Sequence, residues 1–161
     1  MRRKEAKTVV MYYRAIPGMI GLLRQEQTEL ESEYDTLHSA PLDGMPHGSA
    51  PGKPTEALAI HTAESGTYER LEEIKVRLLI LEGDAAMIRG GLDALNGKYK
   101  KLLTLRLLHG YSWGKLSARM GAPDSTIRYW FSMALDQLAR VLEEVPMPEE
   151  LAARASRARS L

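Results

Sequence analysis

The chain has 161 residues, with 22 Lys and Arg against 21 Asp and Glu, and it contains no cysteine. This length suits one domain, or one small domain with an appendage. Leu and Ala number 23 and 18, whereas Val and Ile together number 12, so the β-branched residues that strands favour are scarce. We therefore expect an all-α protein. The absence of cysteine excludes disulfides, thiolate chemistry and Cys-type zinc sites, and it suits a reducing cytosol.

No apolar segment is long enough for a signal peptide or a membrane span. The basic N-terminus is followed only by Val9, Val10 and Met11, which are too few for a signal peptide core. Nothing approaches the ~20 apolar residues that a membrane-spanning helix requires. We expect a soluble intracellular protein with no membrane partner.

The near-neutral total hides an uneven distribution of charge. Residues 55–95 carry four basic and eight acidic groups, whereas residues 96–142 carry eight basic and two acidic groups. A basic segment after an acidic one favours contact with a polyanion such as nucleic acid. Charge by itself leaves open the alternative of a solvated, lysine-rich surface.

We assign residues 1–38 to an N-terminal helix segment. Its heptad seam alternates spacings of four and three along Ile16, Ile20, Leu23, Gln27, Leu30, Tyr34 and Leu37. Pro17 and Gly18 suit a first helical turn better than a helix interior, so the helix is expected to begin near Ile16 and to end before Ser39. Residues 39–54 contain four prolines and three glycines and are predicted to be a mobile linker.

A second long helix is predicted over residues 55–91. Its seam runs Leu71, Ile74, Leu78, Leu81, Ala85, Ile88, Leu92 and Leu95, and Gly90 and Gly91 are expected to interrupt or kink it. The two helices can form an antiparallel hairpin or a coiled coil within the chain, or each can pair with a partner chain. Two ordinary amphipathic helices packed on the rest of the domain are the remaining alternative.

Residues 92–142 contain two short helices about a tight turn. Ser112 is a natural N-cap, and Gly121 suits the left-handed turn at the end of the first helix. A second helix is predicted to start near Pro123 or Asp124. Its buried face would consist of Ile127, Phe131, Ala134, Leu135 and Leu138, and its outward face of Ser125, Arg128, Tyr129 and Ser132. This pattern is typical of a helix-turn-helix.

From Gly110 to Leu138 the sequence resembles region 4 of bacterial sigma factors and related activators. The matching residues are Gly110, Tyr111, Ser112, Trp113, Leu116, Gly121, Thr126, Ile127, Arg128, Ala134, Leu135 and Leu138. The preceding residues 101–107 look like the first helix of that module. Two residues depart from the pattern: Ser117 stands where Ala is usual, and Pro123 replaces the usual capping Ser, so Asp124 is a candidate cap instead.

The layout of the whole chain is similar to that of small regulators of phages and prophages. A Tyr-Arg-x-Ile-Pro start at residues 13–17, a long helix, a Pro/Gly linker, a second long helix and a sigma-like C-terminus are similar to late-gene transcription activators of the RinA and ArpU type. The resemblance implies an activator in the cytoplasm of a bacterial host cell, associated with the nucleoid. Because no sigma region 2 is present, the chain is not a complete promoter-melting sigma factor.

If this segment binds double-stranded DNA, the helix over residues 124–140 enters the major groove. Arg128 is the best base reader because a guanidinium can donate two hydrogen bonds to guanine, and Asp124 can accept one from cytosine N4. Donors at the start of the supporting helix would meet phosphates. Lys98, Lys100 and Arg119 would add salt-dependent attraction, whereas Trp130 is expected to pack at the edge of the buried stripe. The candidate DNA-binding residues are Ser112, Trp113, Lys115, Asp124, Ser125, Thr126, Arg128, Tyr129, Ser132 and Lys101.

Other chemistry finds little support in the sequence. The four histidines are scattered without a helical i, i+4 pair, so we expect no metal and no cofactor. The Gly-rich linker lacks the Gly-Lys-Ser/Thr ending of a P-loop, and no catalytic triad can be assembled from the spacing. We expect no enzyme activity. Residues 143–161 are predicted to be a flexible tail.

The sequence thus predicts a sequence-specific DNA-binding transcription regulator, expected to be a homo-oligomer, that uses its N-terminal helical arm either to dimerise or to contact RNA polymerase. Two rivals remain. A phage terminase small subunit also joins a helix-turn-helix to oligomerising helices, and it predicts a ring rather than a dimer. A sigma-like protein would bind RNA polymerase with the same face and never touch DNA.

Overall fold

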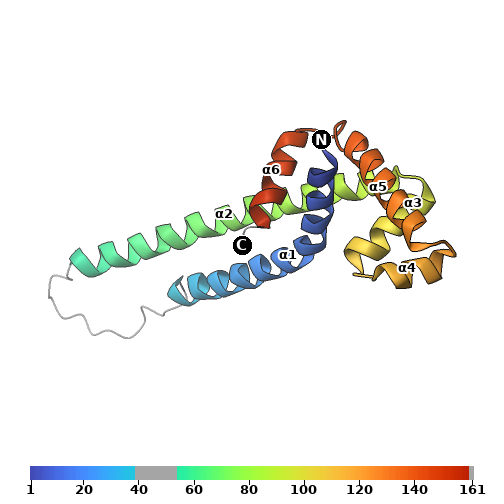
Figure 1. The fold of residues 1–161 in the computed structure, drawn as a ribbon. Coiled ribbons are helices and arrows are strands. Elements are labelled where there is room, and N and C mark those ends of the chain that lie inside the picture. The colour runs from blue at the N-terminus through green and yellow to red at the C-terminus, as the bar shows by residue number, and fades with distance from the viewer. Residues whose placement is uncertain (39–53, 160–161) are drawn as a thin grey trace. The chain divides into compact units, whose positions relative to one another are not determined.

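A computed structural model describes the backbone of residues 1–38 and 54–159 and the side chains of residues 1–35 and 66–159. Within these ranges the chain forms six α-helices and no strand (Figure 1), which confirms the all-α class. The helices are α1 (Arg3–His38), α2 (Pro54–Asp93), α3 (Gly97–Leu103), α4 (Trp113–Met120), α5 (Asp124–Val141) and α6 (Pro148–Ala158), with a π-helical turn at Thr104–Leu108. The linker predicted over residues 39–54 lies outside the described residues, except for Pro54, which begins α2.

The chain divides into two compact units, and α1 and α2 each contribute to both. Unit 1 comprises residues 1–17 and 81–161, and unit 2 comprises residues 18–80. Unit 1 carries 17 Lys and Arg against 10 Asp and Glu, whereas unit 2 carries five against 11. The units therefore have opposite net charge. No helix in the described ranges combines the length and the apolar character needed to cross a membrane.

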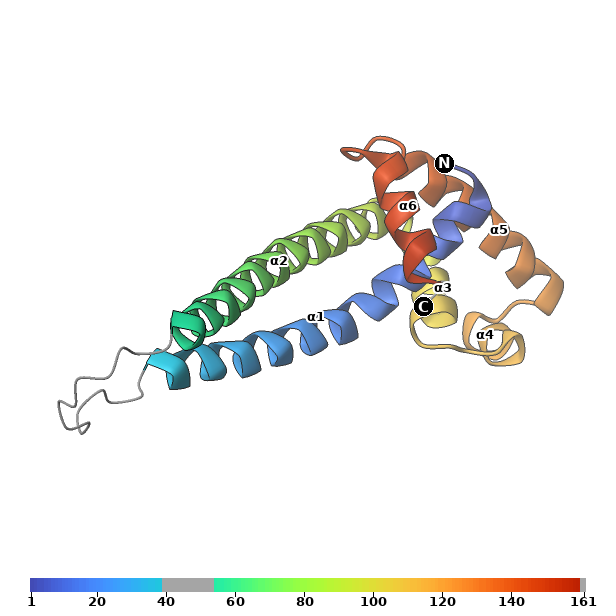
Figure 2. The same ribbon diagram turned by 90° about the vertical axis from the view of Figure 1, so that its left-hand side faces the viewer.

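In unit 2 the long helices run antiparallel and pack together (Figures 1 and 2). Leu23 of α1 and Leu71 and Ile74 of α2 are buried members of the two predicted seams. Arg70 of α2 donates to Glu26 of α1 at 2.7 Å, which adds an ion pair at the edge of the apolar contact. Of the arrangements that the sequence left open, the helices pair within one chain.

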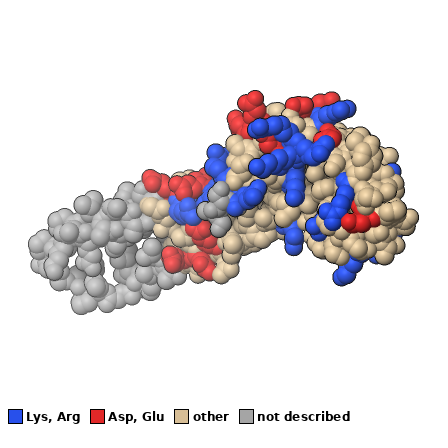
Figure 3. All heavy atoms as spheres, viewed as in Figure 1, with Lys and Arg blue, Asp and Glu red and all other residues tan. Residues whose placement is uncertain are grey.

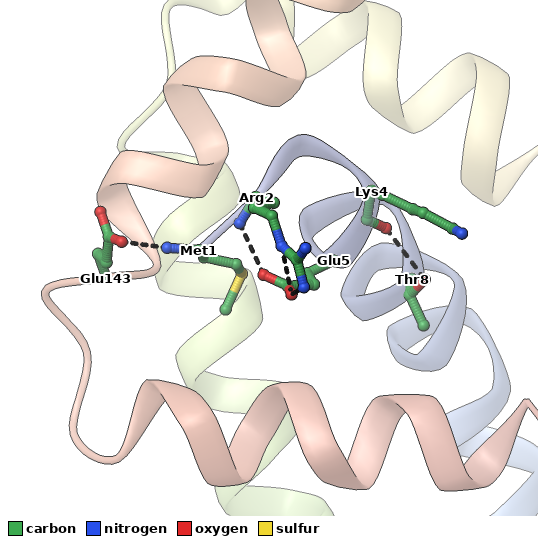
Figure 4. Close-up of polar contacts among 6 residues, drawn as sticks. All are labelled: Met1, Arg2, Lys4, Glu5, Thr8 and Glu143. Carbon is green, nitrogen blue, oxygen red and sulfur yellow. Dashed lines mark hydrogen bonds and ion pairs between the residues drawn. The ribbon is translucent and has the colours of Figure 1, made fainter.

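Helix α1 begins at Arg3, 13 residues before the start expected near Ile16. Its first turn is capped by Glu5, whose carboxylate accepts from the backbone N–H of Arg2 at 2.7 Å and from the Arg2 guanidinium (Figure 4). The backbone hydrogen bond from Arg2 is the main reason that the pKa of Glu5 lies below its usual value. The N-terminal ammonium pairs with Glu143, and the Thr8 hydroxyl donates to the Lys4 carbonyl.

Apolar side chains outweigh the helix-breaking character of Pro17. Ala6, Val9, Val10, Tyr12 and Ile16 are all buried, so the residues before the proline have one continuous apolar face inside unit 1. Pro17 lacks an N–H for the carbonyl of Tyr13, yet it lies inside α1 and at the boundary between the two units. The prediction that Pro17 marks the helix start was wrong because burial on the N-terminal side extends the helix past it.

Helix α2 continues through Gly90 and Gly91 to Asp93, so the interruption expected there is wrong. A Cβ placed on Gly91 would lie 2.9 Å from Cδ2 of Leu142, and Leu142 is fully buried. The absence of a side chain at Gly91 therefore allows α2 to approach the end of α5 closely. A Cβ on Gly90 would meet nothing within 4 Å.

The tail predicted to be flexible instead contains helix α6 over Pro148–Ala158. Leu151 and Ala155 are buried, and Arg154 reaches Asp84 of α2, which is 1% exposed. The Arg154 guanidinium donates to both carboxylate oxygens of Asp84, at 2.7 and 2.9 Å, and the Tyr12 hydroxyl donates to the same carboxylate at 2.9 Å. Burial, followed by the hydrogen bond to Asp84, raises the pKa of Tyr12. Apolar contacts and a buried ion pair thus hold α6 in unit 1.

Candidate nucleic-acid interface

The predicted first helix of the module, residues 101–107, lies in α3 and the π-helical turn that follows it. Its leucines at 102, 103, 105 and 107 are buried, and α3 packs against α5. Arg106 donates to the carbonyl oxygen of Tyr111 at 2.6 Å, and the Tyr111 N–H donates to the carbonyl oxygen of Leu105 at 2.9 Å. These two bonds fix the loop that leads into α4.

Helix α4 begins and ends as its local sequence predicts. The Ser112 hydroxyl accepts from the backbone N–H of Lys115, and Gly121 adopts the left-handed conformation with φ of 64°. Ser117, which departs from the sigma-like pattern, donates its hydroxyl hydrogen bond to the carbonyl oxygen of Ala122 at 2.6 Å. The serine thus closes the turn between α4 and α5, a role that alanine cannot perform.

Helix α5 starts at Asp124, within the predicted range. Pro123 occupies the N-cap position, and no side chain makes a capping hydrogen bond, so the suggestion that Asp124 caps this helix is wrong. The carboxylate of Asp124 instead accepts from Nε of Arg128 at 2.8 Å. All five residues predicted for the buried face are buried: Ile127, Phe131, Ala134, Leu135 and Leu138.

Most of the predicted interface residues lie at the surface of the α4–α5 pair. Ser112, Lys115, Asp124, Ser125, Arg128 and Tyr129 are exposed, and Trp113, Thr126 and Ser132 are half-buried. Lys101 is exposed on α3. The structure brings Arg128 into contact with both Asp124 and Trp113, whereas the Ser112 hydroxyl is already used as a helix cap.

Trp113 lies at the centre of this interface. Its ring packs edge-on against Phe131, with centroids 5.3 Å apart. Two guanidinium groups approach the same ring, that of Arg106 at 4.5 Å and that of Arg128 at 4.8 Å from the centroid. Sequence reasoning did not assign Arg106 to the site. The available signal was its place in residues 101–107, which resemble the first helix of the module.

Two further cations contact aromatic rings of unit 1. Lys98 lies 3.9 Å from the ring centroid of Trp130, and Arg119 lies 5.9 Å from that of Tyr111. Trp130 is half-buried, in agreement with its predicted place at the margin of the apolar stripe. The tryptophans thus help to hold cations near the surface of α3, α4 and α5.

Contacts with Asp124 and Trp113 restrain the Arg128 side chain, but its guanidinium remains available to a base edge. Its side chain is 56% exposed, and that of Asp124 is 48% exposed. An exposed ion pair contributes about 0–1 kcal/mol, whereas a bidentate arginine–guanine pair contributes roughly 1–3 kcal/mol of discrimination. Exchange of the carboxylate for a base edge is therefore energetically accessible. Ordering by Trp113 and Asp124 also lowers the side-chain entropy that Arg128 would lose on binding.

Positive charge in unit 1 extends beyond residues 96–142. Residues 1–17 contribute five Lys and Arg against one acidic residue. In the face drawn in Figure 3, Lys and Arg side chains gather over α6 and the first turns of α1 as well as near α4. These groups add to the general electrostatic attraction of unit 1 for polyanions.

Among the described side chains, no three His, Asp or Glu residues gather in a way that could hold a metal ion. Comparisons of the chain with models of protein families, with curated proteins and with solved structures found no match. Assignment of a function therefore depends on the residues and geometry of the chain itself.

Proposed function

We propose that this chain is a sequence-specific DNA-binding transcription regulator of a phage or prophage. The α4–α5 pair is a helix-turn-helix, α5 enters the major groove, and α4 crosses the sugar–phosphate backbone. The observation that carries the proposal is the outward face of α5, where exposed Arg128 is held by Asp124 and by Trp113 of α4, the helix that Ser112 caps.

Each part of this surface has a distinct role in the proposal. Arg128 donates two hydrogen bonds to O6 and N7 of a guanine, and Asp124, once released, accepts from a cytosine amino group. Ser125, Tyr129 and Ser132 lie on the same outward side and contact base edges or the adjacent backbone. Lys101 and Lys115 attract phosphates without reading sequence.

The charge of unit 1 supports a polyanionic partner. Its 17 Lys and Arg against 10 acidic groups stand in contrast to the acidic unit 2. Charge alone attracts any polyanion, so sequence specificity depends on the α5 face. Activation of late genes, and contact with RNA polymerase, belong to the proposal only through the resemblance to phage regulators of similar layout.

The test is a selection of binding sites from a pool of randomised duplexes with the full chain, followed by fluorescence anisotropy at two salt concentrations. We expect the selected duplex to bind more tightly than a scrambled duplex, with affinity for both falling as salt rises. Absence of binding to either duplex at low salt would overturn the proposal. Binding of purified RNA polymerase under those conditions would favour the sigma-like alternative.

Three variants separate base reading from general attraction. Arg128→Ala should weaken binding to the selected duplex about tenfold or more and leave binding to the scrambled duplex nearly unchanged. Lys101→Ala should weaken both duplexes by the same factor. Arg77→Ala is the matched control, because Arg77 is exposed on α2 in unit 2. Equal effects of Arg128→Ala on both duplexes would refute the assignment of the reading face.

A further inference from the structure

Helix α2 carries apolar residues on two opposite sides. Leu71 and Ile74 are buried in the seam with α1, whereas Val76 and Leu79 are 56% and 72% exposed. At 100° per residue, Val76 lies about 200° around the helix from Ile74. Tyr68 and Ile80, which are 59% and 42% exposed, flank this second side. Several exposed apolar side chains on one side of a helix are typical of an interaction surface.

The exposed side has its own heptad register. Glu72, Val76, Leu79 and Gly83 follow one another at spacings of four, three and four. We call this the outer face of α2. A Cβ placed on Gly83 would meet nothing within 4 Å, so no described residue covers the face at that position. The pattern is that of a helix prepared to pack against another helix.

We propose that the outer face of α2 binds the same face of a second copy of the chain, with the two α2 helices antiparallel about a twofold axis. The axis passes between Val76 and Leu79, so that Val76 of each copy packs against Leu79 of the other. Glu72 of each copy then lies opposite Gly83 of the other, where the absent side chain leaves room for it. Such a self-complementary contact is the usual form of a closed dimer.

Charge complementarity favours a second copy of the chain as the partner and the antiparallel orientation of the two α2 helices. In the antiparallel register the flanking position of Lys75 faces Glu82 of the second copy, and the twofold axis repeats the pair. In a parallel register Lys75 would face Ile80, without an ion pair. Lys75 is half-exposed and pairs with Glu72 at 2.8 Å within its own chain, so its ammonium already lies beside the outer face.

The composition of this segment disfavours a polyanionic partner. Between residues 66 and 82, α2 carries three Lys and Arg against four Glu. Nucleic acid therefore suits unit 1 and not this face. The proposal does not depend on DNA binding, although a dimer would supply the two reading modules that specific sites usually require.

Sedimentation equilibrium of the full chain over a range of concentrations tests the association. We expect a species of twice the 18.0 kDa chain mass. Leu79→Glu should weaken the association roughly a hundredfold, because each dimer loses the buried leucine twice. Leu22→Glu is the matched control, since Leu22 is 71% exposed on α1 and lies outside the outer face. A chain that stays at 18.0 kDa throughout, or equal effects of the two variants, would overturn the proposal.

Cross-linking tests the relative orientation of the two α2 helices. Because the native chain contains no cysteine, only the introduced cysteines can react with a maleimide. A mixture of Glu72→Cys and Gly83→Cys chains, treated with a short bis-maleimide, should give a cross-linked heterodimer. Each variant alone should not cross-link, because two copies of residue 72 would lie about 16 Å apart along the axis. Efficient cross-linking of either variant alone would indicate a parallel pair and refute the register. Lys75→Glu should weaken the dimer, and Glu82→Lys in the same chain should restore it.

Discussion

Replacement of Arg154 by methionine should destabilise unit 1 by about 3 kcal/mol, because it leaves the Asp84 carboxylate buried without its cation. Asp84 is 1% exposed and accepts two hydrogen bonds from Arg154 and one from Tyr12. Methionine retains most of the aliphatic stem, so the change removes charge and hydrogen bonds with little loss of packing volume.

The magnitude follows from the burial of the two partners. Removal of one partner from a buried ion pair costs roughly 3–5 kcal/mol. The side chain of Arg154 is 22% exposed, so water can reach the vacated site from one side, and the Tyr12 hydroxyl still donates to Asp84. Both effects place the expected cost at about 3 kcal/mol, a large share of the ~5–15 kcal/mol that stabilises a typical domain.

Urea denaturation at pH 7, followed by circular dichroism, measures this cost. We expect the free energy of unfolding of Arg154→Met to lie about 3 kcal/mol below that of the wild type, because the Asp84 carboxylate loses its cation and two of its three hydrogen bonds.

Two controls make the prediction decisive. Arg157→Met changes an exposed arginine on the same helix and should alter the free energy of unfolding by less than about 0.5 kcal/mol. The double variant Asp84→Asn with Arg154→Met removes both charges but keeps an oxygen that accepts from the Tyr12 hydroxyl, and it should recover most of the loss. If Arg154→Met and Arg157→Met lower the free energy of unfolding by the same amount, the ion pair with Asp84 does not hold α6 in unit 1.

Three further predictions concern the interface and the termini of the helices. Asp124→Asn removes a negative charge near the phosphates, so affinity for the scrambled duplex, where Asp124 reads no base, should rise severalfold by anisotropy; an unchanged or lower affinity for that duplex would contradict this electrostatic effect. Gly121→Ala forces a φ of 64° on a side-chain-bearing residue and should lower stability by about 1–2 kcal/mol in urea titrations, whereas Gly114→Ala, with a Cβ in open space, should not. The hydrogen bond from Arg3 lowers the pKa of Asp136, so the stability from this pair is present above the ordinary aspartate pKa and is lost as the pH falls through the lowered value. Asp136→Asn should therefore flatten the fall of Tm in acid, and an unchanged acid limb would refute this contribution.

Helix ends in the α4–α5 region were predictable because their signals are local. Ser112 caps α4 through the N–H three residues later, and Gly121 supplies the left-handed residue at its end. Proline at 123 sets the start of α5 within one residue. Each signal acts over a few residues, so no knowledge of distant contacts is needed. The buried face of α5 follows for the same reason, since helical spacing alone places its apolar residues together.

Contacts between segments distant in sequence decided the features that the sequence did not predict. The start of α1 depends on burial of its apolar face inside unit 1, and Gly91 acquires its role only where Leu142 approaches it. Helix α6 is held by Asp84, some 70 residues away in the chain. The contact of Trp113 with both Arg106 and Arg128 likewise needed the structure.

By itself, the sequence determined the all-α class, the capped start of α4 and the apolar face of α5, because composition, capping and periodicity act within a helix or a turn. Only the tertiary structure decided which helices pair within the chain, which charges are buried and which apolar face of α2 remains uncovered. Burial and ion pairing depend on the surroundings of a side chain in space, and residues far apart in sequence supply those surroundings.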